Sequence, residues 1–93
     1  MIQANLPLAA LSMDLKRVAL ASHNHSQKVA DRFIQESLAK KNNIDPAAQL
    51  PHVRRLLTTL DSVLAQKDTA KLAEDALLYS TLFQNAAIQK SST

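Results

Sequence analysis

The sequence predicts an all-α protein: a small antiparallel helical bundle of three main helices, a long first helix and two shorter ones, with a core completed by dimerisation. Apolar residues recur at spacings of three and four along most of the 93 residues, which is the pattern of amphipathic helices. Hydrophobic residues make up 46% of the chain and charged residues 20%, enough apolar material for a folded core. The length predicts a single domain, residues 1–93.

The first predicted helix covers residues 12–41 and follows an N-terminal segment, residues 1–11. Ser12 suits an N-cap, and a pair of lysines stands at the other end, where the helix dipole favours cations. The alternative is two helices broken near residues 23–25. Because neither proline nor glycine stands there, a single helix about 45 Å long is favoured. A stripe with two polar members runs through the whole segment: Leu11, Leu15, Val18, Ser22, His25, Val29 and Phe33.

A loop with a short turn is predicted at residues 42–50, because asparagine and aspartate, which favour turns, precede Pro46. Asp45 is expected to cap the turn that Pro46 starts. The second helix covers residues 51–67 and opens at its proline. Its apolar residues fall within an arc of about 120°: Val53, Leu56, Leu57, Leu60, Val63 and Leu64.

The third predicted helix covers residues 69–90. If the second helix simply continued, its apolar stripe would be displaced by roughly 100° in the third segment. This slip favours a turn before Thr69, with Asp68 or Thr69 as the new N-cap. A kinked continuous helix is the alternative.

The third helix is apolar over an arc of roughly 260°, wider than one partner helix covers. Leu78 and Leu82 lie on one flank of this arc, and Leu77 and Ile88 lie on the other. A 45 Å first helix would also overhang its shorter partners. Both arguments predict a homodimer, or a module that completes its core on another helical protein. A self-contained three-helix bundle with a few exposed leucines is the alternative.

Several kinds of chemistry are excluded or disfavoured. The chain has no glycine, so the phosphate-binding loop, the dinucleotide fingerprint and the EF-hand loop are absent. It has no cysteine for a disulfide or a thiolate metal site. His23 and His25 point about 200° apart on a helix and cannot share a metal. Glu74 and Asp75 are the only adjacent carboxylates, and a surface patch explains them. We therefore expect no enzyme activity, no cofactor and no metal.

A weakly basic face is the second candidate surface. Arg17, Lys28 and Arg32 fall within a sector of roughly 60° if the first helix is continuous. The net charge is only +3, which is ordinary for a small domain. The favoured function is therefore a non-enzymatic protein–protein interaction or oligomerisation module. The alternative is a nucleic-acid-associated regulator that uses this face.

The sequence also carries an expectation about location. The first eleven residues are largely apolar but have no basic residue ahead of them, and Asp14 follows soon after, which is unlike a secretory signal. No apolar run approaches the roughly 20 residues that a membrane helix needs. We expect a cytoplasmic protein that does not enter the membrane.

Overall fold

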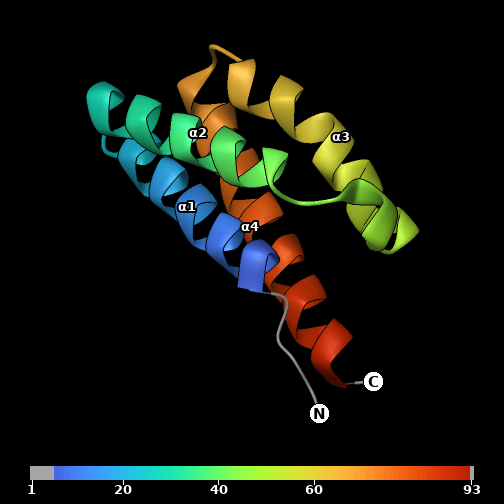
Figure 1. Ribbon diagram of the computed structural model, residues 1–93. Helices are drawn as coiled ribbons and strands as arrows, with labels where there is room; N and C mark the ends of the chain where they lie inside the picture. Colours follow the sequence, from blue (N-terminus) through green and yellow to red (C-terminus); the bar gives the residue numbers. More distant parts are fainter. Residues whose placement is uncertain (1–5, 93) are drawn as a thin grey trace.

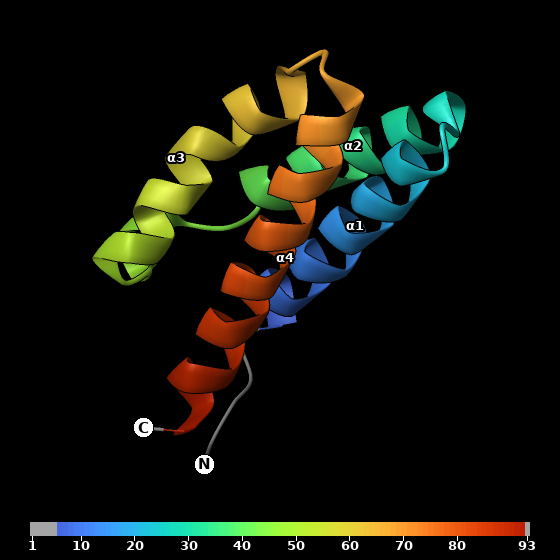
Figure 2. The same cartoon turned by 180° about the vertical axis from the view of Figure 1, so that it is seen from behind.

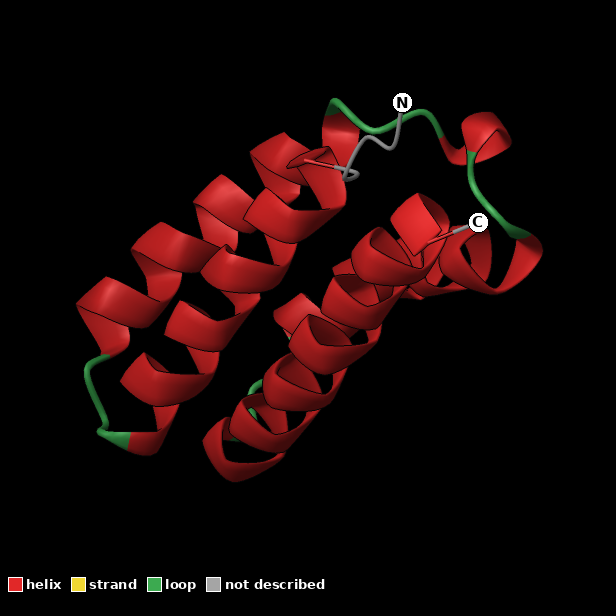
Figure 3. Ribbon diagram, turned by 90° about the horizontal axis from the view of Figure 1, so that it is seen from below, coloured by secondary structure: helices red, strands yellow, loops and turns green. Residues whose placement is uncertain are grey.

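The computed structural model describes the backbone of residues 6–92 and the side chains of residues 6–88. Within this part, every regular element is helical and no strand occurs (Figure 3). The elements are, in order, α1 (Leu6–His23), α2 (Gln27–Asn42), the 3-10 turn η1 (Pro46–Ala48), α3 (Pro51–Ala65) and α4 (Thr69–Ser92). The all-α class is confirmed, but four helices replace the expected three.

The helix α1 lies between two antiparallel neighbours. Figure 1 shows α2 folded back along one side of α1 and α4 running beside it in the opposite direction. Seen from behind, α3 leads into α4 through a short connection at one end of the bundle (Figure 2). The bundle is elongated, with extents of 42 × 19 × 19 Å.

The expectation of one helix over residues 12–41 is wrong. The helix α1 ends at His23, and His25 adopts a left-handed conformation with φ 59°. Its backbone N–H donates to the carbonyl of Ser22 at 3.2 Å, and the next N–H, that of Ser26, donates to Ala21 at 2.8 Å. These two bonds form a Schellman motif, which usually places glycine at the left-handed position. Histidine serves here because it tolerates this region better than most residues.

The N-terminal boundary also differs from the expectation. Of the predicted segment 1–11, residues 1–5 lie outside the described part, and residues 6–11 are helical. Pro7 stands in the first turn of α1, where its missing N–H costs no helical bond. Ser12 is therefore no N-cap: it lies inside the helix and is buried.

The lengths of the helices remove one argument for dimerisation. Because α1 has 18 residues, α2 has 16 and α4 has 24, α4 is the longest helix at about 36 Å. No 45 Å first helix overhangs the bundle. An argument for self-association must rest on the exposed side chains alone.

The remaining turns follow the predicted chemistry. The Asp45 carboxylate accepts the N–H of Ala47 at 3.0 Å, and Pro51 opens α3. α3 and α4 are separate helices, as the phase slip predicts, and α3 ends at Ala65. The Asp68 carboxylate caps α4 by accepting the N–H of Lys71 at 3.1 Å.

Phe83 is fully buried and lies in the core that joins α1, α3 and α4. Tyr79 meets it edge-on at a ring-centroid distance of 6.2 Å, a favourable aromatic geometry. The Tyr79 hydroxyl lies 2.8 Å from the hydroxyl of Thr59, which ties α3 to α4. The larger aliphatic side chains of the core are Leu8, Leu11, Leu15, Val18, Ile44, Val53, Leu57, Leu60, Leu64 and Leu72.

Candidate interaction surface

Small side chains bring α1 and α4 together. The buried hydroxyl of Ser12 donates to the carbonyl of Ser80 at 2.7 Å, and the hydroxyl of Ser80 donates back to the carbonyl of Ser12 at 2.8 Å. The two hydroxyl oxygens are 3.2 Å apart. This reciprocal contact requires the two backbones to approach closely, and Ala19 and Ala76, both buried, keep the approach open on either helix.

A hollow of about 340 Å³ opens along the outer side of this helix pair. We call it the α1/α4 seam; its lining residues are Lys16, Ala19, Leu20, His23, Ala73, Glu74 and Leu77. Leu20 and Leu77, one on each helix, are about half exposed, at 54% and 51%. The seam is therefore an apolar surface that the described part of the chain does not cover.

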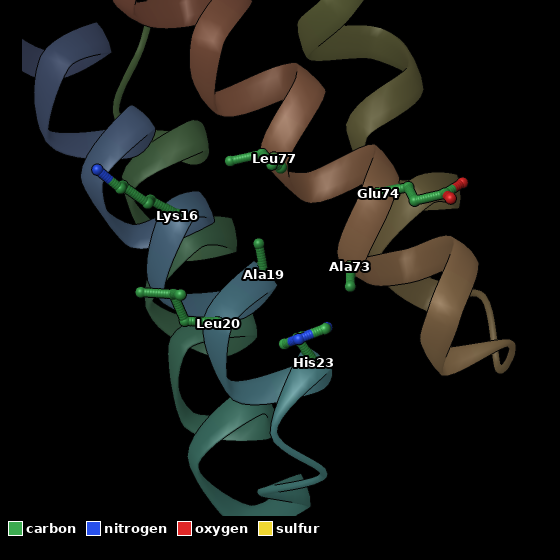
Figure 4. A pocket seen from close by; sticks show the side chains of 7 residues that line it. All are labelled: Lys16, Ala19, Leu20, His23, Ala73, Glu74 and Leu77. Atoms are coloured by element: carbon green, nitrogen blue, oxygen red, sulfur yellow. The ribbon is translucent and has the colours of Figure 1, made fainter.

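The side chains around the seam have distinct directions (Figure 4). Leu77 points from α4 toward α1, and Ala19 and Ala73 lie at the gap between the helices. The Lys16 amine and the Glu74 carboxylate extend away on opposite sides. The seam thus has Ala19, Ala73 and Leu77 at its middle, the His23 ring at one end of the gap, and edges of opposite charge.

The four apolar residues predicted to interact are all exposed, but they do not form one surface. Leu77, at 51% exposure, lies about 60° beyond Ser80 around α4, next to α1. Leu82 lies about 60° beyond Tyr79 in the opposite sense, on the side that faces α3. Ile88, 58% exposed, lies on the same flank as Leu77, and Leu78, 54% exposed, lies on the same flank as Leu82. A flat partner can therefore cover one flank at a time.

The basic residues were predicted to share a face on one continuous helix, and that reason fails because the helix is broken. Arg17 lies on α1, whereas Lys28 and Arg32 lie on α2. The fold nevertheless brings the two arginines together, since their guanidinium carbons lie 5.6 and 5.8 Å from the centre of the Phe33 ring. Two cation–π contacts on one half-buried ring replace the expected helical sector.

Asp14 is a carboxylate that the fold buries. It is only 2% exposed, because α2 covers this side of α1. Arg17 donates to one carboxylate oxygen at 3.0 Å, and Lys40 of α2 forms an ion pair with the other. Both cations remain partly exposed. The ion pairs compensate a buried charge and link α2 to α1.

The two adjacent carboxylates do not act as a pair. Glu74 is exposed, while Asp75 lies at the junction of α3 and α4 and accepts a bond from the Gln66 side chain at 2.9 Å. The Gln66 hydrogen bond, followed by Lys71 at 3.3 Å, holds the pKa of Asp75 below its ordinary value, although partial burial opposes this shift. Asp75 is thus a structural contact between α3 and α4.

Two of the three histidines, His23 and His25, lie at the exposed C-terminal end of α1. His23 and His25 line a second hollow, of about 340 Å³, together with Glu74 and the first residues of α4. Within the described residues, no group of three or more histidine and carboxylate side chains is arranged to hold a metal ion.

None of the described helices combines the length and the apolar composition that crossing a membrane requires. Comparison with known proteins adds no assignment, because no family model, curated protein or solved structure matches the chain. The proposed function therefore rests on the exposed side chains and hollows of the protein surface.

Proposed function

We propose that this protein is a non-enzymatic interaction module that pairs with a second copy of itself through the α1/α4 seam. The observation that carries the proposal is the uncovered apolar hollow between Leu20 and Leu77, whose side chains are half exposed on neighbouring helices. Apolar patches with polar edges are typical of protein–protein contacts.

The charges at the edges support a second copy as the occupant. A two-fold axis that runs along the seam places α1 of one copy over α4 of the other, as a closed dimer requires. Lys16 of each copy then faces the edge that carries Glu74 of its partner. Opposite charges meet at both edges, and the apolar residues meet between them.

The exposed areas set the expected strength. Full burial of a leucine is worth about 1.5–3 kcal/mol, so covering a half-exposed leucine gains about 1 kcal/mol. Leu20 and Leu77 from two copies therefore contribute about 4 kcal/mol. By itself this corresponds to a dissociation constant of about 1 mM, which is that of a weak dimer.

Analytical ultracentrifugation over a concentration series tests the proposal. We expect the apparent mass to rise from 10.2 kDa toward twice that value as the concentration increases. Leu77→Glu should keep the protein monomeric, because the charge would be buried in the seam. Leu78→Glu is the matched control, since Leu78 is equally exposed on the other flank of α4.

Two results would overturn the proposal. One is a wild-type protein that stays at the monomer mass up to about 1 mM, the expected dissociation constant. The other is a dimer that Leu78→Glu disrupts and Leu77→Glu does not, which would move the interface to the flank with Leu82. Circular dichroism of each variant shows whether its helices are intact.

A nucleic-acid-associated regulator is the weaker alternative. Of the three basic residues behind it, Arg17 is ion-paired with Asp14, and Arg17 and Arg32 both lie over Phe33. The single-helix basic face behind this alternative is also broken, because Arg17 lies on α1 and Arg32 on α2.

A further inference from the structure

A third hollow lies next to the α1/α4 seam around α1, between the C-terminal half of α1 and the start of α2, and Leu20 lines both hollows. It measures about 270 Å³, and the apolar residues that line it are Leu20, Ala21, Val29 and Phe33. Val29 is 46% exposed. We call this hollow the α1/α2 pocket. Among the described residues, no carboxylate lines it, and the one charged lining residue is Arg17.

Cations gather around this pocket. The guanidinium groups of Arg17 and Arg32 both lie within 6 Å of the Phe33 ring centre, at 5.6 and 5.8 Å. Stacking on one ring restricts both side chains, so their N–H groups are presented in fixed directions. Lys28 stands four residues before Arg32, on the same exposed side of α2.

The carboxylates nearby do not cancel this charge. Asp14 is buried beneath Arg17 and shares its charge between Arg17 and Lys40. Glu36 is half-buried, one turn along α2 from Arg32. Asp31 is exposed on α2, next to Arg32. With Lys28, the four cations exceed these three carboxylates by one charge, and the excess lies at the surface.

We propose that the α1/α2 pocket binds an acidic amphipathic helix of a partner protein. An apolar side chain of the helix enters between Leu20 and Val29, and its carboxylates pair with Arg17, Arg32 and Lys28. Helices that dock in this way place apolar anchors in a groove and match charge at its rim. Arginine suits the role because its planar group binds a carboxylate through two parallel hydrogen bonds.

The same geometry disfavours a nucleic acid as the occupant. Base stacking needs an exposed aromatic face, whereas Phe33 is half-buried and carries two guanidinium groups. A phosphate backbone would also have to lie against the exposed apolar side chains of Leu20 and Val29. The proposal does not depend on dimerisation, because Arg32 and Val29 do not line the α1/α4 seam.

Fluorescence anisotropy with a synthetic probe tests the proposal. The probe is a labelled amphipathic helical peptide with leucines on one face and glutamates on the other. Its counterpart carries glutamine in place of every glutamate. We expect the acidic peptide to bind at least about tenfold more tightly than the neutral one, equivalent to 1.4 kcal/mol, with an affinity that falls as salt is added.

Matched variants locate the site. Arg32→Glu should weaken binding of the acidic peptide about tenfold, whereas Lys67→Glu, the same charge change at a distant exposed position, should not. Val29→Asp should weaken it similarly, and Leu50→Asp is the control because Leu50 is equally exposed, at 49% against 46%. Amide chemical-shift changes on peptide addition should centre on residues 17–33.

Three outcomes would overturn the proposal. The first is equal affinity for the acidic and neutral peptides, and the second is an equal effect of Arg32→Glu and Lys67→Glu on peptide binding. The third is a protein that binds a single-stranded oligonucleotide but neither peptide, and loses that binding in Arg32→Glu. Leu77→Glu separates this proposal from the dimer. That variant should lose self-association and bind the peptide at least as tightly as the wild type, so either proposal can fail alone.

Discussion

The contact between Ser12 and Ser80 leads to a prediction about the stability of the bundle. Both side chains are almost fully buried, at 3% and 4% exposure, and their hydroxyl oxygens are 3.2 Å apart. We consider Ser80→Val, which replaces the hydroxyl with a methyl group and adds a second one. There is no room for them unless α1 and α4 move apart.

The expected cost has two parts. The variant loses the bond from the Ser80 hydroxyl to the Ser12 carbonyl, worth about 1 kcal/mol net. Overpacking a tight contact costs typically about 1–3 kcal/mol. The sum is about 2–4 kcal/mol, a large share of the roughly 5–14 kcal/mol expected for 93 residues. Ser80→Ala loses only the hydrogen bond and gains helix propensity, so its cost should be about 0.5 kcal/mol.

Urea unfolding followed by circular dichroism measures these differences. All variants are compared at one protein concentration, because self-association would raise the apparent stability. Thr81→Val is the control: it places valine at the adjacent, exposed position and should change the free energy of unfolding by less than about 0.5 kcal/mol. If Ser80→Val were no less stable than Ser80→Ala or Thr81→Val, the close approach of α1 and α4 would not depend on small side chains at this contact.

Two further predictions concern the ends of the helices. His25→Gly should raise the free energy of unfolding by up to about 1 kcal/mol, because glycine adopts the left-handed conformation without the steric penalty; a lower midpoint in urea would contradict the Schellman motif. Asp75→Asn should lower stability at neutral pH. The folded-state pKa of Asp75 lies below its ordinary value of 3.8, so its contribution is present above that pH and is lost as the pH falls through the lower folded value. The difference between wild type and variant, measured by urea unfolding across pH, should therefore shrink in acid; a constant difference would show that the charge of Asp75 is not the cause.

Helix periodicity and capping chemistry predicted the second half of the fold well. The apolar arc from Val53 to Leu64 becomes the buried side of α3, and Asp68 caps α4 as expected. These features are visible in the sequence because each depends on residues close together in the chain.

The break between α1 and α2 was less visible. The Schellman motif usually needs glycine at its left-handed position, and this chain places His25 there. The exposed side chains of His25 and Val29 show that the predicted stripe ends at Ser22, and a new one begins at Ala30. The two polar members of the stripe were the available signal.

The candidate surfaces depended on contacts between distant parts of the chain. The flanks of α4 were predicted correctly as exposed, because the width of an apolar arc can be counted in one helix. The stacking of Arg17 and Arg32 on one Phe33 ring and the burial of Asp14 both follow from the position of α2 against α1. Periodicity does not determine that position. For that reason the α1/α2 pocket was not predicted.

Leu20 lines both hollows, so the two proposed binding events use the same side chain. A ligand that takes its side chain toward α2 withdraws it from α4, so each event should weaken the other by the same factor. The fraction of dimer would then fall as the partner becomes more abundant, and the side-chain rotamer of Leu20 would decide which of the two complexes forms.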